Sequence, residues 1–83
     1  MLIHSPKELA LLVTNQRKKL KLSQTEVSKR IGIRQQTVSE FENNPENSQL
    51  TTVFDILSAV NLSVQIEAKD KILSAKSTWK EEW

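Results

Sequence analysis

Hydrophobic residues in the first sixty positions recur at the three- and four-residue spacing of amphipathic helices. The first helix is predicted to begin at Ser5-Pro6-Lys7-Glu8, which has a capping serine, a proline at the first helical position and a glutamate three residues after the cap. It is expected to end near Lys21, where a cluster of cations is favourably placed against the helix dipole. The inner face of this helix is expected to carry Leu9, Leu12, Val13 and Leu20, with the polar Gln16 at the same helical spacing.

The next segment predicts two short helices joined by a sharp turn. Ser23-Gln24-Thr25-Glu26 repeats the capping pattern, so a second helix is expected from Gln24 to about Ile31. Gly32, the only glycine of the chain, ends it, because glycine enters the left-handed conformation without steric cost. After the turn Gly32-Ile33-Arg34, a third helix is expected from about Gln35 to Glu42, with Val38 and Phe41 on its inner face.

Beyond a polar loop, the hydrophobic period first continues and then changes. A fourth helix is marked by Leu50, Val53, Phe54, Leu57 and Val60. Leu62, Val64 and Ile66 then alternate with polar residues, which predicts a half-buried strand. A lone strand leaves its backbone unpaired, so we expect these three residues to form the dimer contact with the same strand of a second copy. Extension along the monomer's own core is the alternative.

These patterns predict a mainly all-α fold: a four-helix domain plus one C-terminal β-strand that pairs across a homodimer. Residues 1–68 are expected to form the folded domain, which also dimerises, and residues 69–83 to be a tail that is disordered in isolation. Trp79 and Trp83 lie in this tail, outside the predicted fold. Because tryptophan is frequent at the centre of interfaces, we interpret the tail as an arm that binds a partner.

Composition narrows the functional class. A chain of 83 residues forms only a small core, so its stability needs a further source. The chain has no cysteine and one histidine, so neither disulfides nor a structural zinc site can supply it. Oligomerisation is the remaining ordinary source of stability. We expect no catalytic residue, metal or cofactor, because the chain lacks a glycine-rich phosphate loop and an evident carboxylate pair, and His4 is interpreted as a surface residue. With no signal peptide and no long apolar run, a cytoplasmic location with no membrane partner is expected.

Charge is unevenly distributed. Residues 1–37 carry eight Lys or Arg against two Glu, whereas residues 38–83 carry four Lys against eight acids. A basic front half is suited to a phosphate backbone, although charge alone is equally consistent with a solvated surface. Cations and cap residues near the second helix are the predicted phosphate contacts: Arg17, Lys18, Ser23, Gln24, Thr25 and Lys29.

The two-helix unit from Ser23 to Glu42 has the form of a DNA reader, in which the second helix lies in the major groove. Arginine can pair with guanine and glutamine with adenine through two hydrogen bonds each, and the threonine methyl can contact thymine. A polar run of this kind also occurs on ordinary soluble helices. The predicted base-reading residues are Arg34, Gln35, Gln36, Thr37 and Ser39.

The whole segment Leu22–Asn43, with Ser-Gln, glycine and Gln-Gln at these spacings, resembles the Xre or lambda-repressor-like class of helix-turn-helix proteins. The resemblance implies that Gln24 contacts phosphate and supports Gln35, while Gln36 and Thr37 read bases. Four further features are similar to the HipB-like antitoxins: Phe41-Glu42-Asn43-Asn44-Pro45, the helix beginning Leu50-Thr51-Thr52-Val53-Phe54, the strand Leu62-Ser63-Val64 and the final tryptophan.

This second resemblance implies a homodimeric transcriptional repressor that autoregulates its operon through a palindromic double-stranded operator and is nucleoid-associated when bound. It further implies a HipA-like serine/threonine kinase toxin as partner, with Trp83 inserted in the toxin. Two alternatives stay open: a stand-alone Xre-type repressor with no toxin partner, and an accessory DNA-binding component of a split three-part toxin–antitoxin system.

Overall fold

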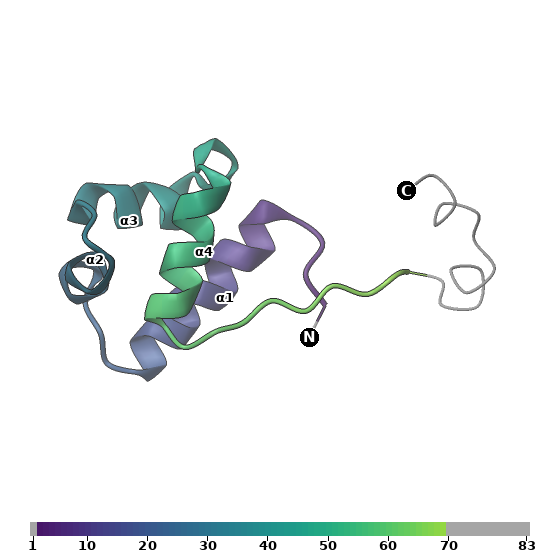
Figure 1. The fold of residues 1–83 in the computed structure, drawn as a ribbon, viewed down its shortest axis with the longest axis horizontal. Helices are drawn as coiled ribbons and strands as arrows, with labels where there is room; N and C mark the ends of the chain where they lie inside the picture. Colours follow the sequence, from purple (N-terminus) through teal and green to yellow (C-terminus); the bar gives the residue numbers. More distant parts are fainter. Residues whose placement is uncertain (1, 70–83) are drawn as a thin grey trace.

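The computed structural model describes residues 2–69, and the chain order of the elements is α1 (Pro6–Lys19), α2 (Gln24–Ile31), α3 (Gln35–Asn43), the 3-10 helix η1 (Pro45–Asn47) and α4 (Leu50–Ala59) (Figure 1). The predicted four-helix, mainly all-α class is confirmed. The end of α1 comes slightly before the predicted Lys21, because Lys21 itself takes a left-handed conformation. None of the helices in this part of the chain is both long enough and apolar enough to span a membrane.

Local side-chain caps explain where α1 and α2 begin. The Ser5 Oγ accepts a hydrogen bond of 3.1 Å from the Glu8 backbone N–H, with Pro6 in the first helical position. At α2 the capping box is complete: the Ser23 Oγ accepts from the Glu26 N–H at 3.0 Å, and the Glu26 Oε1 accepts from the Ser23 N–H at 2.8 Å. The hydrogen bonds from the Ser23 backbone and hydroxyl lower the pKa of Glu26.

Three helices end in the same way, with a left-handed residue followed by a hydrophobic one that packs against the core. The left-handed residues are Lys21 (φ 60°), Gly32 (φ 72°) and Asn61 (φ 61°). The backbone N–H of each following residue donates to the carbonyl five positions earlier: Leu22 to Arg17 (3.0 Å), Ile33 to Ser28 (3.1 Å) and Leu62 to Leu57 (2.8 Å). These closures set the directions in which the chain enters α2, enters α3 and leaves α4.

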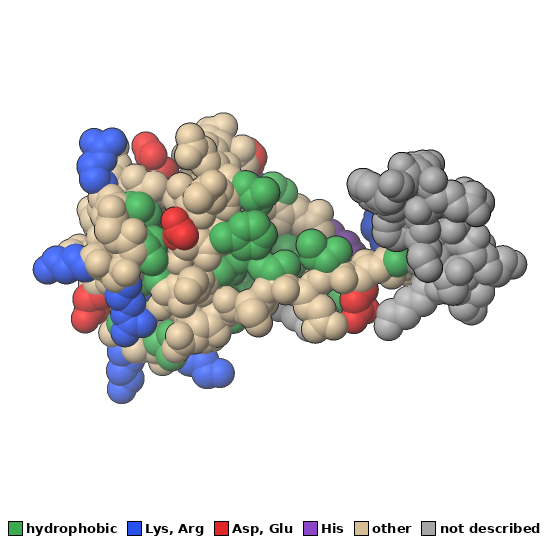
Figure 2. Space-filling view, in the orientation of Figure 1, with side chains coloured by type: hydrophobic (Ala, Val, Ile, Leu, Met, Phe, Trp, Pro, Cys, Tyr) green, Lys and Arg blue, Asp and Glu red, His purple; other side chains and the backbone are tan. Residues whose placement is uncertain are grey.

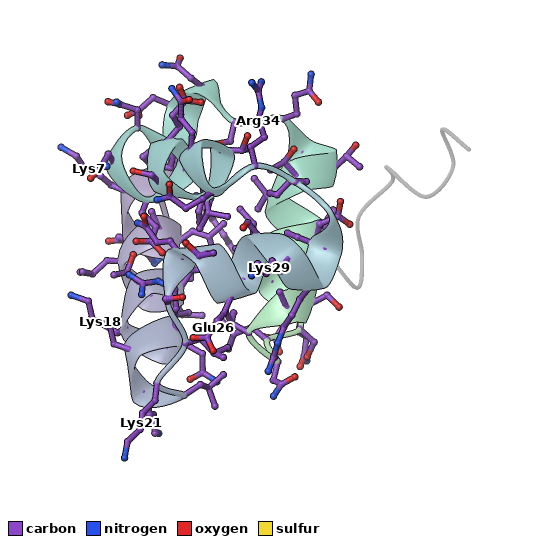
Figure 3. All side chains as sticks on the ribbon, turned by 90° about the vertical axis from the view of Figure 1, so that its left-hand side faces the viewer. Lys7, Lys18, Lys21, Glu26, Lys29 and Arg34 are labelled. Carbon is purple, nitrogen blue, oxygen red and sulfur yellow. The ribbon has the colours of Figure 1, made fainter. Side chains whose placement is uncertain are left out.

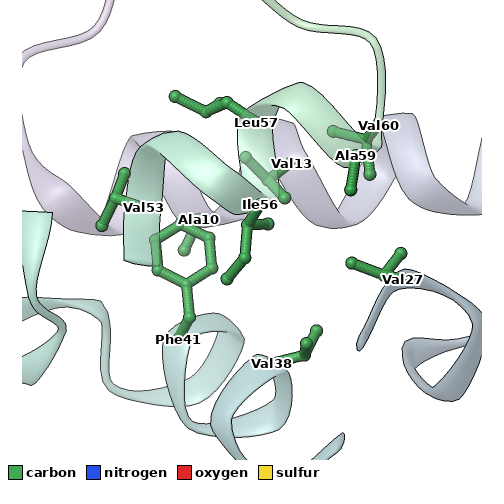
Figure 4. Close-up of a cluster of buried hydrophobic side chains, with 10 residues drawn as sticks. All are labelled: Ala10, Val13, Val27, Val38, Phe41, Val53, Ile56, Leu57, Ala59 and Val60. Atoms are coloured by element: carbon green, nitrogen blue, oxygen red, sulfur yellow. The ribbon is translucent and has the colours of Figure 1, made fainter. Parts of the chain in front are cut away.

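All four α-helices contribute side chains to one hydrophobic core. Phe41 of α3, only 1% exposed, is the largest buried side chain, and Figure 4 shows its ring below Ala10 of α1 and beside Ile56 of α4. Because α2 and α3 both pack into this core, their relative orientation is fixed by burial. The buried hydrophobic residues are Ala10, Val13, Val27, Val38, Phe41, Val53, Ile56, Leu57, Ala59 and Val60.

The C-terminal end of α4 is held by side chains from both α1 and α2. The Arg30 NH1 donates to the Ala59 carbonyl at 2.9 Å, and the Gln16 Nε2 donates to the Val60 carbonyl at 3.1 Å. Helix C-termini leave carbonyls without partners within the helix, so these two donors satisfy groups that burial would otherwise strand. They also fix the point at which the C-terminal segment leaves the helical body.

Residues 62–69 run away from the helices as an extended segment (Figure 1), to which no strand is assigned within this single chain. Leu62 packs against the core, but Val64 is 48% and Ile66 is 87% exposed. Packing of these side chains along the monomer's own core does not fit this exposure. Pairing with a second copy stays a prediction, and the predicted tail roles of Trp79 and Trp83 lie outside the described residues.

Gly32→Ala is expected to lower the free energy of unfolding by about 1–2 kcal/mol, because a Cβ disfavours the left-handed conformation. An added Cβ meets no atom within 4 Å, so the cost is purely conformational. Lys21→Gly is the matched change in the opposite direction and is expected to stabilise the fold, since Lys21 has a φ of 60°. Urea unfolding followed by circular dichroism measures both, and equal midpoints for Gly32→Ala and the unmodified protein would contradict the account.

Candidate nucleic-acid interface

The first turn of α3 presents the predicted base-reading residues at the surface. Arg34 is the N-cap of α3 and is exposed, as are Gln35 and Gln36. The half-buried Thr37 and Ser39 follow, and the Ser39 Oγ accepts a hydrogen bond of 3.3 Å from Asn43. With its opposite face buried in the core, α3 has the exposed polar edge that insertion into a major groove requires.

Cations project from the helices that precede this edge and from its first residue. In Figure 3, Lys18 and Lys21 project from the end of α1, Lys29 lies on α2 and Arg34 projects beyond α2 at the start of α3. Figure 2 shows the same concentration of basic side chains at the end opposite the C-terminal segment. Among residues 2–69, the one ion pair within 4.0 Å joins Arg17 and Glu42, so Lys18 and Lys29 keep unpaired charges available to phosphates.

Arg17 differs from the other predicted phosphate contacts because its charge is already paired. Its Nε lies 2.7 Å from the Glu42 Oε2 and its NH2 donates to Oε1 at 3.0 Å, while NH1 donates to the Leu22 carbonyl at 2.9 Å. The Arg17 and Glu42 side chains are only 11% and 7% exposed. The sequence prediction did not anticipate this pairing, which braces α1 against α3 and gives Arg17 an internal role.

The environment of Glu42 fixes its charge state. Burial raises its pKa, but hydrogen bonds from Arg17 and Gln24, together with the positive charge of Arg17, outweigh burial and hold the pKa below its ordinary value. Glu42 is therefore a carboxylate at neutral pH. In that state it accepts hydrogen bonds and cannot donate one.

The two glutamines that open α2 and α3 are hydrogen-bonded, as the resemblance implied. The Gln35 Nε2 donates to the Gln24 Oε1 at 2.7 Å. The Gln24 Nε2 in turn donates to the Glu42 Oε1 at 2.9 Å. Sequence reasoning missed Glu42, although its place seven residues after Gln35 puts the two on the same face of α3.

Ser23 and Thr25 lie at the N-terminal end of α2, where the helix dipole favours an anion. The Ser23 Oγ accepts the capping hydrogen bond from the Glu26 backbone, and its hydroxyl also bonds the Glu26 carboxylate, so it can donate to a ligand only by exchanging that second bond. Thr25 is exposed in the first turn of α2. Both residues therefore lie where a phosphate contact by the start of α2 is geometrically possible.

An open polar groove of about 840 Å³ borders α3, and sequence reasoning did not identify it. Arg34, Thr37 and Glu40 line it from the α3 side, and the segment before α4 lines it from the other. Gln49 is the N-cap of α4, so the backbone N–H groups of the first turn of α4, which have no partner within the helix, lie just after it. The feature of the sequence that could have indicated this groove is the run of mainly polar residues before Leu50. The lining residues of that segment and of α4 are Asn44, Asn47, Ser48, Gln49 and Thr52.

Comparisons with known proteins agree with this geometry. Residues 14–66 match the helix-turn-helix family. The chain is 42% identical to the antitoxin HipB of Escherichia coli O6:H1 over 82 residues, which cover 98% of this chain and 87% of that protein. It is 40% identical to the antitoxin HipB of Escherichia coli K12, also over 82 residues, which cover 98% of this chain and 93% of that protein. The structure of a HipA-HipB-O2-O3 complex superposes with a TM-score of 0.81 at 41% identity, covering 84% of this chain and 99% of that chain.

Proposed function

The chain belongs to the helix-turn-helix family and, within it, to the HipB-like antitoxins, and from that premise we propose that it is a homodimeric repressor of its own operon that also binds a HipA-like kinase toxin. The protein is a DNA-binding antitoxin component and not an enzyme. The observation that carries the DNA-binding role is the exposed first turn of α3, where Gln24 holds Gln35 by a hydrogen bond of 2.7 Å.

Sequence reading is assigned to α3 in the major groove. Arg34 is placed at its start to pair with guanine, and Gln35 and Gln36 to pair with adenine, each good pair contributing about 1–3 kcal/mol of discrimination. The methyl group of Thr37 and the hydroxyl of Ser39 complete the contacting edge. The exposure of Arg34, Gln35 and Gln36 supports this assignment.

Phosphate binding is assigned to both sides of α3. Lys18 and Lys29 supply unpaired charges, and Ser23, Gln24 and Thr25 supply hydrogen-bond donors at the start of α2. Arg17 acts in this arrangement by holding Glu42 and thereby Gln24. On the other side, the groove beside the start of α4 supports a second backbone contact by Ser48, Gln49 and Thr52.

Dimerisation is assigned to Leu62, Val64 and Ile66, within a DNA-binding and dimerisation domain of residues 1–68. The 87% exposure of Ile66 supports a partner chain, because a β-branched apolar side chain in an alternating segment is suited to a pleated, half-buried surface. A two-fold dimer implies a palindromic operator with half-sites about 10 base pairs apart, or a multiple of that. The site of action is the cytoplasm, at the nucleoid when the operator is bound.

The toxin contact is assigned to the tail, residues 69–83, through Trp83. HipA accompanies HipB in the complex that this chain resembles at 41% identity, and the HipB-like family supports the same kind of partner here. Affinity capture of the tagged full-length protein from its own cells, with and without Trp83, tests this assignment. Recovery of a HipA-like kinase that falls on deletion of Trp83 is expected. Recovery of operator DNA without any kinase or kinase fragment would reduce the function to that of a stand-alone repressor.

Gln36→Ala and Lys18→Ala are expected to weaken DNA binding in different ways. Gln36→Ala should lower affinity for the operator more than affinity for random sequence, because base contacts specify whereas phosphate contacts position. Lys18→Ala should weaken both alike and reduce the salt slope by about one, because each phosphate contact releases counterions. Anisotropy titrations over a series of salt concentrations measure this, and equal losses on both DNAs for Gln36→Ala would refute its assignment.

A further inference from the structure

We propose that Glu42, clamped by Arg17, is a positioning residue for base recognition: acting through Gln24, it fixes which end of the Gln35 amide faces DNA. This inference rests on the proposed DNA-binding function and deepens it. Glu42 itself is not placed to reach a base, because its side chain is 7% exposed and lies two helical turns along α3 from Gln35.

A continuous chain of hydrogen bonds links the buried ion pair to the exposed glutamine. Arg17 grips both oxygens of Glu42, at 2.7 Å and 3.0 Å, and is itself held by the Leu22 carbonyl at 2.9 Å. The Glu42 Oε1 accepts from the Gln24 Nε2 at 2.9 Å. The Gln24 Oε1 accepts from the Gln35 Nε2 at 2.7 Å. The carboxylate therefore cannot rotate away without breaking its two bonds to Arg17.

The direction of this chain follows from the chemistry at its buried end. An ionised carboxylate only accepts hydrogen bonds, so Gln24 must turn its NH2 group towards Glu42. Its carbonyl oxygen then points to Gln35, which must donate with its own NH2 group. If the group at position 42 were able to donate, both amides would be equally satisfied in the reversed orientation, and the polarity of Gln35 would be undetermined.

The orientation that results leaves Gln35 with a matched donor and acceptor. One N–H of its Nε2 is used on Gln24, so one N–H and the Oε1 oxygen remain for DNA. A glutamine reads adenine with this pair of groups, donating to N7 and accepting from the N6 amino group. Fixing the amide before DNA binds also avoids the entropy cost of ordering it at the interface. Glu42 thereby contributes to discrimination at the base pair that Gln35 contacts.

Selection from a random duplex library tests this and requires no known operator sequence. The full-length protein is compared with Gln35→Ala, Glu42→Gln and the control Glu46→Gln, an exposed acid of η1 that undergoes the same change of charge. Gln35→Ala is expected to lose the base preference at one position of each half-site. Glu42→Gln is expected to reduce the preference at that same position by about fivefold to a hundredfold, the value of one base pairing. Glu46→Gln should keep it.

A second set of variants separates positioning from stability. Gln24→Leu cuts the chain but leaves the contacts between Arg17 and Glu42 in place. On the Gln24→Leu background, Glu42→Gln is expected to cause no further loss of preference at the Gln35 position, although its effect on unfolding persists. Arg17→Lys keeps the charge but loses the two-bond contact with Glu42, and it is expected to weaken the same base preference to a smaller extent. The inference can therefore be tested with this variant even if Glu42→Gln does not fold.

The outcomes distinguish this inference from the function on which it rests. If the unmodified protein selects no sequence, the proposed DNA-binding function itself fails. If it selects a site and Glu42→Gln retains the preference that Gln35→Ala loses, the function stands and the positioning role is overturned. A uniform loss at all positions in Glu42→Gln, or selection of the unmodified site by Gln35→Ala, likewise overturns it.

Discussion

Replacement of Ile66 by lysine is expected to lower affinity for the operator by about a hundredfold to ten-thousandfold, because it separates the two DNA-reading units. When the units are joined, binding of the first half-site holds the second at high effective concentration. Ile66 is 87% exposed in the single chain, so its replacement removes no packing from the protomer. The lost affinity therefore reports the loss of the partner chain alone.

The matched control for Ile66→Lys is Gln65→Lys, which adds the same charge on the opposite face of the extended segment. Sedimentation velocity is expected to show a monomer for Ile66→Lys and a dimer for Gln65→Lys, with unchanged circular dichroism for both. Anisotropy titrations against the operator then measure the difference in affinity. A dimeric Ile66→Lys that binds the operator normally would place the dimer contact elsewhere in the chain.

Glu42→Ala is expected to lower the free energy of unfolding by about 3 kcal/mol, because removing one partner of a buried ion pair leaves the other charge without compensation. The change leaves the guanidinium of Arg17 without its counter-charge at a site where its side chain is only 11% exposed, and it removes the acceptor for Gln24. In a domain of this size such a loss corresponds to a fall of about 12–24 °C in Tm. Differential scanning calorimetry measures it.

Glu40→Ala is the control for Glu42→Ala, because Glu40 is exposed on the same helix and has no ion-pair partner among residues 2–69. Its Tm is expected to change by only about a few degrees. Similar losses for the two variants would show that the ion pair with Arg17 contributes no more than an ordinary surface charge.

The same carboxylate predicts how stability depends on pH. Burial raises the pKa of Glu42, but the stronger effect of its hydrogen bonds and of Arg17 brings it below the ordinary value of 4.5. The resulting stabilisation is fully present above that ordinary value and is lost as the pH falls through the lower pKa of the folded state. Glu42→Gln should therefore lose less stability than the unmodified protein on acidification below about pH 4.5.

Sequence patterns predicted those features whose causes are local. Helices α1 and α2 begin where Ser5 and Ser23 cap them, and Gly32 ends α2 in the left-handed conformation at φ 72°. Each of these depends on contacts a few residues apart, so the order of residue types is sufficient to specify it. The similar ends of α1 and α4 were less visible, because they use Lys21 and Asn61 where α2 has glycine.

The part of the site that depends on long-range contact was not predicted. Arg17 and Glu42 are 25 residues apart in the chain. The sequence of the cations near the end of α1 does not indicate which of them is buried against α3. Only the packing of α1 against α3 distinguishes Arg17 from the neighbouring Lys18, which remains exposed. The strand prediction at Leu62, Val64 and Ile66 is limited in a different way, since a partner for that backbone exists only in a second chain.

The most direct test is footprinting on the promoter of the protein's own operon, because both the repressor role and the base-reading roles proposed here require sequence-specific operator binding by a two-fold dimer. A two-fold dimer should protect two symmetric half-sites on one face of the duplex, centred about 10 base pairs apart or a multiple of that. Gln36→Ala is expected to abolish this protection at protein concentrations where Glu46→Gln retains it. Uniform protection along the promoter, with no difference from unrelated DNA, would contradict the account.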